Sequence, residues 1–85
     1  MNSDNFTEHL LNAIEQLPHD VFNFTKLDAR SADMFSIKAV LLVFNLNEER
    51  RTRWLPFSQL RKDGNNNIWI ANWLLEKIQT DGKND

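Results

Sequence analysis

The run of residues 35–44, FSIKAVLLVF, limits the possible folds of this chain more than any other stretch. It is rich in β-branched and aromatic side chains, which favour strands, with Val40 and Val43 lying between Phe35 and Phe44. Successive side chains of a strand point to opposite faces, so this strand would be apolar on both sides. Such a strand belongs in the middle of a sheet or beneath a helix. A buried helix is the alternative, because periodicity does not separate the two in so short a run.

An amphipathic helix is predicted over residues 3–17. Ser3 or Asp4 can cap its N-terminus. Pro18 predicts its end, because the residue before a proline is disfavoured in helical backbone. The apolar side chains of this segment recur at spacings of three and four, which gathers them on one stripe that we expect to pack in the core. The stripe comprises Phe6, Leu10, Ala13, Ile14 and Leu17.

Residues 19–33 carry less periodicity than the rest of the chain. Residues 21–25 alternate in the manner of a short strand. Residues 26–33 are polar and indicate a loop or a turn of helix.

The chain after residue 44 predicts a hairpin and a second helix. Residues 45–50 form a polar connection, and residues 51–55 return as a strand that Pro56 ends, since proline cannot donate to a ladder. Asp63-Gly64 predicts a turn that the following asparagines extend, because asparagine tolerates left-handed backbone. Residues 67–70 then form a third strand. Asn72 is the expected N-cap of a helix over 73–79, and residues 80–85 are expected to be a flexible tail.

Together these elements predict an α+β fold in one domain spanning residues 1–85. The N-terminal helix packs on a small antiparallel sheet of three to four strands, with residues 21–25 as the candidate fourth, and the short C-terminal helix closes one end. Antiparallel pairing follows from connections that are too short to hold a crossover helix. A chain of 85 residues has no room for a second core. The three tryptophans are expected to anchor this core.

Composition excludes several classes of site. The chain has no cysteine, so disulfides, thiolate metal sites and thiol catalysis are ruled out. The first residues lack the basic start and apolar centre of a signal peptide, and the longest apolar run is too short to span a bilayer. We therefore expect a cytoplasmic protein without membrane association.

A series of short motifs resembles a group of small phage- and prophage-encoded proteins. The motifs are Lys38-Ala39-Val40, Trp54-Leu55-Pro56 with Ser58, Ile68-Trp69-Ile70, and Trp73-Leu74 followed by Lys77. They cover residues 37–78. The resemblance implies a mobile-element setting and a small α+β or barrel-like core, and it brings no catalytic residues. Phe57 departs from the group's pattern, in which a polar residue is common at this place, and the acidic N-terminal helix lies outside the resemblance.

No constellation in the sequence supports catalysis. A metal site needs several close ligands, and the two histidines, His9 and His19, are accompanied only by scattered carboxylates. Ser58 has no base with a recognisable spacing and is better explained as a turn residue. The two glycines are isolated, so no phosphate-binding loop is present. We expect a non-enzymatic protein without metal or other cofactor.

Charge is distributed unevenly, although the net charge is only −2. One cluster, the basic edge, interleaves with aromatic residues Trp54 and Phe57, and it comprises Arg50, Arg51, Arg53, Arg61 and Lys62. An acidic face is predicted near the N-terminus, and it comprises Asp4, Glu8, Glu15 and Asp20. Such asymmetry can steer a partner, or it can reflect an acidic helix lying beside a basic hairpin within one molecule.

Two functions follow from these features. The first is an accessory protein, expected to be of phage or mobile-element origin, that binds a protein partner or forms a homodimer. The alternative is a single-stranded nucleic-acid-binding module, in which cations contact phosphates and the aromatic residues stack on bases. The negative net charge favours the first function.

Overall fold

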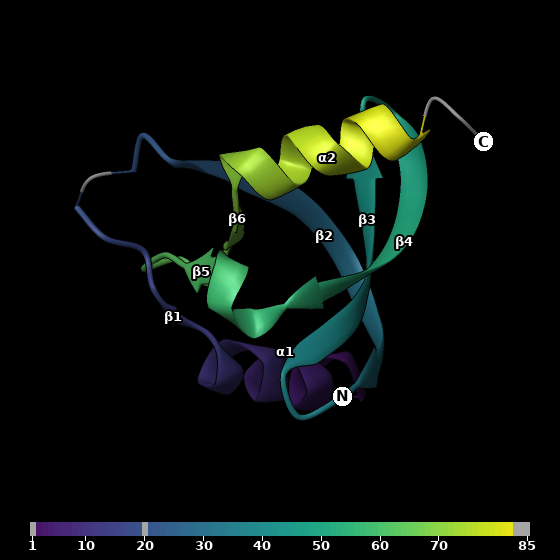
Figure 1. The fold of residues 1–85 in the computed structure, drawn as a ribbon. Helices are drawn as coiled ribbons and strands as arrows, with labels where there is room; N and C mark the ends of the chain where they lie inside the picture. The colour runs from purple at the N-terminus through teal and green to yellow at the C-terminus, as the bar shows by residue number, and fades with distance from the viewer. Residues whose placement is uncertain (1, 20, 83–85) are drawn as a thin grey trace.

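The computed structural model describes residues 2–19 and 21–82 and shows a curled mixed sheet with one helix at each end (Figure 1). The elements are α1 (Asn2–Ala13), β1 (Glu15–Gln16), β2 (Phe24–Phe35), β3 (Ala39–Leu46), β4 (Glu49–Pro56), η1 (Phe57–Gln59), β5 (Leu60–Lys62), β6 (Ile68–Ala71) and α2 (Asn72–Gly82). Within the described residues the sheet has six strands in the order β1-β5-β6-β2-β3-β4. The predicted α+β class is confirmed, but the sheet has more strands than the three to four expected.

Strand β2 joins the two halves of the sheet. Its first four residues pair antiparallel with β6, and from Asp28 onward it pairs antiparallel with β3. Two register shifts interrupt the second pairing and leave Arg30 and Asp33 as extra residues. Such bulges bend a strand and increase its twist, which lets one strand serve both halves. The prediction of a loop or helical turn over residues 26–33 is therefore wrong, and the candidate strand at 21–25 begins only at Phe24.

The predicted central strand is β3, shifted toward the C-terminus. It lies between β2 and β4, as its two apolar faces required, but it begins at Ala39. Phe35 instead ends β2, and Ile37 and Lys38 form the turn between the two strands. Burial alternates along β3, and the fully or nearly fully buried residues are Val40, Leu42, Phe44 and Leu46.

The turn between β3 and β4 has only two residues, Asn47 and Glu48, and both have positive φ, at 53° and 68°. This geometry matches the right-handed twist of a hairpin, and the sequence Asn-Gly suits it best. A glutamate in left-handed backbone carries a steric cost of roughly 1–2 kcal/mol.

Glu48→Gly is expected to stabilise the fold by up to about 1 kcal/mol, because glycine removes the steric cost while losing some chain entropy. Thermal unfolding should show a midpoint about 4–8 °C higher per kcal/mol gained. Asn47→Gly is the control and should gain less, because asparagine already tolerates this backbone. An unchanged or lowered midpoint for Glu48→Gly would contradict a strained turn.

The predicted three-stranded meander is wrong in its third strand. Strand β6 pairs with β2 and β5 and not with β4, because η1 and β5 carry the chain away from β4 before β6 forms. Strand β5 was not anticipated. The sheet is mixed and not wholly antiparallel, since β1 runs parallel to β5.

Both helices differ from their predicted bounds. Helix α1 ends at Ala13 and not at residue 17, because the chain extends into β1 and the Leu17 amide donates to the Lys62 carbonyl at 2.7 Å. Of the predicted stripe, Leu10 and Ile14 are buried and Leu17 is half-buried, but Ala13 is exposed, and the side chain of Phe6 lies outside the described residues. Helix α2 runs from Asn72 to Gly82, so residues 80–82 are helical and not tail. The expectation for residues 83–85 lies outside the described residues.

The core fills the inside of the curled sheet between the two helices. Most of its members come from alternate positions of the strands. Leu10 of α1 and Ile78 of α2 add the helical contribution, and Ile14 joins them from the residue that follows α1. The completely enclosed side chains are Val40, Leu42, Phe44, Leu55, Leu60 and Ile70.

Candidate functional site

The solvent-facing side of the β2–β3–β4 sheet, here called the outer face, consists of cross-strand rows. Residues directly opposite in an antiparallel sheet share a face. One row is charged and polar, with Asp28, Asn45 and Arg50 in register, and the Asn45 side chain donates to Asp28 Oδ2 at 3.3 Å. Two rows further from the β3–β4 turn, Met34, Leu41 and Trp54 stand in register.

The apolar end of the outer face comprises Met34, Ile37, Leu41, Val43, Trp54 and Pro56. Trp54 is 48% exposed and Met34 is 57% exposed, although they flank the same residue, Leu41. Ile37 projects from the adjoining β2–β3 turn and is 93% exposed. Single exposed apolar residues are ordinary, but a contiguous group indicates a contact surface.

The prediction that the three tryptophans lie in the core is wrong for Trp54 and Trp73. On β4, Leu55 takes the inner face and is buried, so alternation turns Trp54 outward. Trp73 lies in the first turn of α2, is 57% exposed, and donates from its indole nitrogen to Gln59 Oε1 at 2.9 Å. Trp69 is half-buried and anchors a turn described below.

The basic edge does not form one surface. Arg61 and Lys62 lie on β5, which three other strands separate from β4 in the sheet order. Arg61 Nη1 donates to the carbonyls of Ser58 and Leu60 at 2.8 and 2.7 Å, and its guanidinium lies 5.0 Å from the centre of the Phe24 ring. Lys62 Nζ donates to the Leu11 carbonyl in the last turn of α1 at 2.5 Å. Both cations are therefore engaged within the fold, and Lys62 contacts a carbonyl at the C-terminal end of α1, where a positive charge is favourable.

The three arginines of β4 also separate. Along β4, Arg51 and Arg53 lie on the face of the sheet opposite to Trp54. There the Arg51 guanidinium pairs with the Glu49 carboxylate at 3.0 Å. Arg53 Nη1 donates to the Thr52 carbonyl at 3.1 Å. In a hairpin with a two-residue turn, the amide and carbonyl of Thr52 point away from β3 and toward the free edge of β4. The hydrogen bond from Arg53 therefore occupies part of this edge. Arg50 alone shares the outer face with Trp54.

The remaining predicted site residues do not join this surface. Phe57, in η1, is half-buried and packs against the core. Glu8 and Glu15 are exposed on α1 and β1. The side chain of Asp4, and Asp20 as a whole, lie outside the described residues. The acidic face is therefore described only in part.

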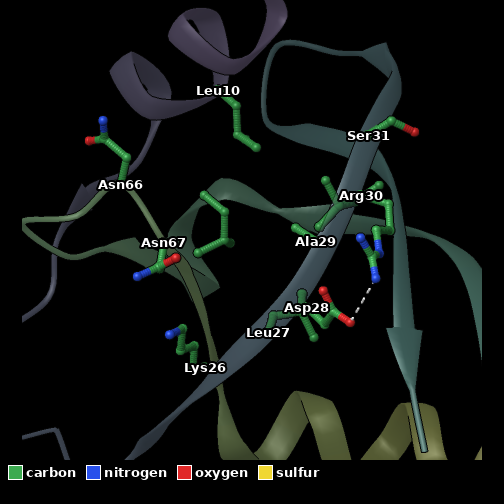
Figure 2. A pocket seen from close by; sticks show the side chains of 11 residues that line it. Leu10, Lys26, Leu27, Asp28, Ala29, Arg30, Ser31, Asn66 and Asn67 are labelled. Carbon is green, nitrogen blue, oxygen red and sulfur yellow. Dashed lines mark ion pairs between the residues drawn. The ribbon is translucent and has the colours of Figure 1, made fainter. Parts of the chain in front are cut away.

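A pocket that the sequence did not reveal opens beside β2, between α1 and the turn before β6 (Figure 2). Its volume is about 430 Å³. The lining comprises Leu10, Lys26, Leu27, Asp28, Ala29, Arg30, Ser31, Leu42, Asn66, Asn67 and Ile68. Sequence reasoning missed it because it depends on β2 being a strand.

The turn at the rim of this pocket is organised by Asp63. Oδ1 of Asp63 accepts from the amides of Asn65 and Asn67 at 2.8 and 2.9 Å, and Oδ2 accepts from the side chains of Asn67 and Trp69 at 3.2 and 2.9 Å. The Trp69 indole and the Asn67 amide hold the pKa of this carboxyl well below its ordinary value. Asn66, at a φ of 67°, supplies the left-handed residue that the predicted turn required.

Comparisons with protein families, with curated proteins and with solved structures found no match to this chain. Within residues 2–19 and 21–82, no three acidic or histidine side chains lie close enough together to hold a metal ion. None of the helices in the same part of the chain is long and apolar enough to cross a bilayer. Among the described residues, the outer face and the pocket beside β2 are candidate sites.

Proposed function

We propose that this chain is a non-enzymatic accessory protein that binds a protein partner through the apolar end of the outer face. The observation that carries the proposal is the register of Met34, Leu41 and Trp54, which exposes two large apolar side chains on either side of a third. Centrally placed tryptophans with apolar neighbours are typical anchors of protein interfaces. The partner's contact surface should be apolar at its centre, with acidic groups facing Arg50 and Lys38, two exposed cations near the patch. A phage origin is part of the proposal and rests on the sequence resemblance.

The occupant that we propose is a different protein, because the β4 edge that borders the apolar end of the outer face is poorly suited to pairing with a second copy of this chain. Two copies that pair through the free edge of β4 meet an obstacle in each register near its middle. A two-fold antiparallel pairing centred on Thr52 sets Arg51 against Arg53 of the other copy, and centring on any of the three arginines sets it against itself. Centring on Trp54 avoids this, but it sets Pro56, which has no amide hydrogen to donate, against Thr52. Like charges directly opposite are destabilising. The bond from Arg53 to the Thr52 carbonyl also blocks this edge.

Trp54→Ala is expected to weaken partner binding about thirtyfold or more, the effect of an interface anchor worth about 2 kcal/mol. Trp73→Ala is the matched control, because Trp73 is similarly exposed but lies on α2. Tagged wild-type protein and both variants would be incubated with host lysate after nuclease treatment, and the recovered proteins compared. The proposal requires a stoichiometric protein that Trp54→Ala loses and Trp73→Ala retains, followed by titration with the purified partner. Equal recovery by both variants would contradict it.

Single-stranded nucleic-acid binding is the second candidate, favoured by exposed Trp54 on the same face as Arg50. The dispersal of the other cations weakens this candidate. If it were correct, an oligonucleotide would quench tryptophan fluorescence in a salt-dependent manner, and both Arg50→Gln and Trp54→Ala would abolish the quenching. Quenching of this kind would replace protein binding as the proposed function.

A further inference from the structure

The pocket beside β2 lies where the sheet opens. Strand β6 pairs with β2 only as far as Leu27, opposite Ile68. Beyond this point β2 is paired with β3 on its other edge, and residues 28–31 border the pocket. Figure 2 shows Leu10 of α1 pointing down into the space from one side, while Asn66 and Asn67 stand across it from Ala29 and Arg30.

The floor of the pocket is apolar and already assembled. Leu10, Leu27, Leu42 and Ile68 border it and are each no more than 6% exposed, so they are fixed by core packing. A pocket of about 430 Å³ falls within the size range that binds small molecules. An apolar body can therefore be seated without rearrangement of the sheet.

The rim of the pocket is polar and carries more positive than negative charge. Its charged members are Lys26, Asp28 and Arg30. The Lys26 ammonium has no ion-pair partner within the described part of the chain. Asp28 is already engaged, because its Oδ2 lies 3.5 Å from Arg30 Nη2 and 3.3 Å from the Asn45 amide nitrogen. The rim therefore favours an anionic group over a cationic one.

Arg30 reaches the rim because of a β-bulge. It is the extra residue between Ala29 and Ser31 in the pairing of β2 with β3. Bulges commonly re-aim a side chain, and they are frequent next to binding sites. The pair with Asp28 uses only part of the guanidinium, which carries five donor hydrogens, and about half of each side chain remains exposed. Arg30 can thus contact a ligand while it keeps this pair.

We propose that the pocket binds a small carboxylate with an apolar tail. The tail lies on Leu10, Leu42 and Ile68, and the carboxylate is held by Lys26 and Arg30, with the side-chain amide of Asn67 nearby on the rim. This site is separate from the outer-face interface, and it stands whether or not the proposed protein binding is correct.

The test is a titration of isotope-labelled full-length protein, followed by amide resonances in NMR spectra, with octanoate as the probe. Octanol and octylamine share its tail and differ only in the head group. Octanoate is expected to shift the amides of residues 26–31 and 66–68 in a saturable manner, and to bind more tightly than either analogue. The double variant Lys26→Gln, Arg30→Gln should weaken octanoate binding about tenfold, equivalent to one charge-assisted contact of about 1.4 kcal/mol.

Lys38→Gln combined with Arg50→Gln is the matched control, since it removes the same charge from exposed sites outside the pocket. It should leave octanoate binding within about twofold of wild type. Three results would overturn the proposal: no saturable shift at about 10 mM octanoate, equal affinity for octanoate and octanol, or an equal loss in both double variants. Thermal unfolding of both variants verifies that they fold, because all four side chains are exposed.

Discussion

Phe44→Ala should destabilise the domain by about 3–5 kcal/mol, the usual cost of emptying a buried aromatic site. Phe44 has no exposed surface. Its strand, β3, pairs with a strand on each side, and Phe44 itself lies opposite Ala29 of β2 and Arg51 of β4. The sheet cannot collapse around the cavity without disturbing both pairings. A small domain is commonly stable by only about 5–15 kcal/mol, so this loss approaches the whole stability at the lower end. The expected fall in the unfolding midpoint exceeds about 12 °C.

Denaturant unfolding followed by fluorescence and by circular dichroism would measure this loss. Ile37→Ala is the control, because Ile37 is 93% exposed and its truncation should change stability by less than about 0.5 kcal/mol. The two variants also separate folding from binding, since Ile37 belongs to the apolar end of the outer face. A loss below about 1 kcal/mol for Phe44→Ala would show that β3 does not run through the centre of the core.

Asp63→Ala should have the second-largest effect on stability, because it removes the acceptor of four hydrogen bonds in one turn. The indole nitrogen of Trp69 and the amide of Asn67 would each lose their carboxylate partner. Asp63→Asn should be less damaging, since its remaining oxygen can still accept from the backbone amides. We expect the unfolding midpoints to fall in the order wild type, Asp63→Asn, Asp63→Ala.

This carboxylate also makes stability dependent on pH. Its pKa is lower in the folded protein than in the unfolded chain, where an aspartate titrates at about 3.9. The folded state therefore gains stability above that value and loses it as the pH falls below about 4. Thermal melts of wild type and Asp63→Asn from about pH 7 to pH 3 should show their difference shrinking at the acidic end. A difference that stays constant with pH would contradict this role of Asp63.

The two helices and the β3–β4 hairpin could be predicted because their sequence signals are local. Leu10 and Ile14 follow helical spacing, and the run 35–44 contains most of β3. Strand β2 could not be predicted, because its bulges break the alternation on which strand prediction depends. Leu27 is its only buried residue, and all residues between Leu27 and Met34 are polar, charged or alanine, so no run of large apolar side chains marks the strand.

The candidate sites were harder to predict than the fold, for two physical reasons. Alternation along β4 shows that Trp54 and Leu55 face opposite ways, but the sequence does not show which of them faces the core. The sequence places Lys62 in a basic edge, because cations that interleave with aromatic residues favour a binding surface. Its actual partner is a helix carbonyl 51 residues earlier in the chain, a contact that spacing cannot predict.

The place of β6 within the sheet has a consequence for the synthesis of the protein. This strand is the last of the six to be translated, yet it lies between β2 and β5 and contributes Ile70, which is wholly buried. The β2–β3–β4 segment can form its hairpins earlier, but the core remains open until β6 arrives. During that interval the exposed apolar surface is at risk of association. Ribosome-bound chains that stop before residue 68 should accordingly be sensitive to protease, and resistance should appear only after β6 has left the ribosome.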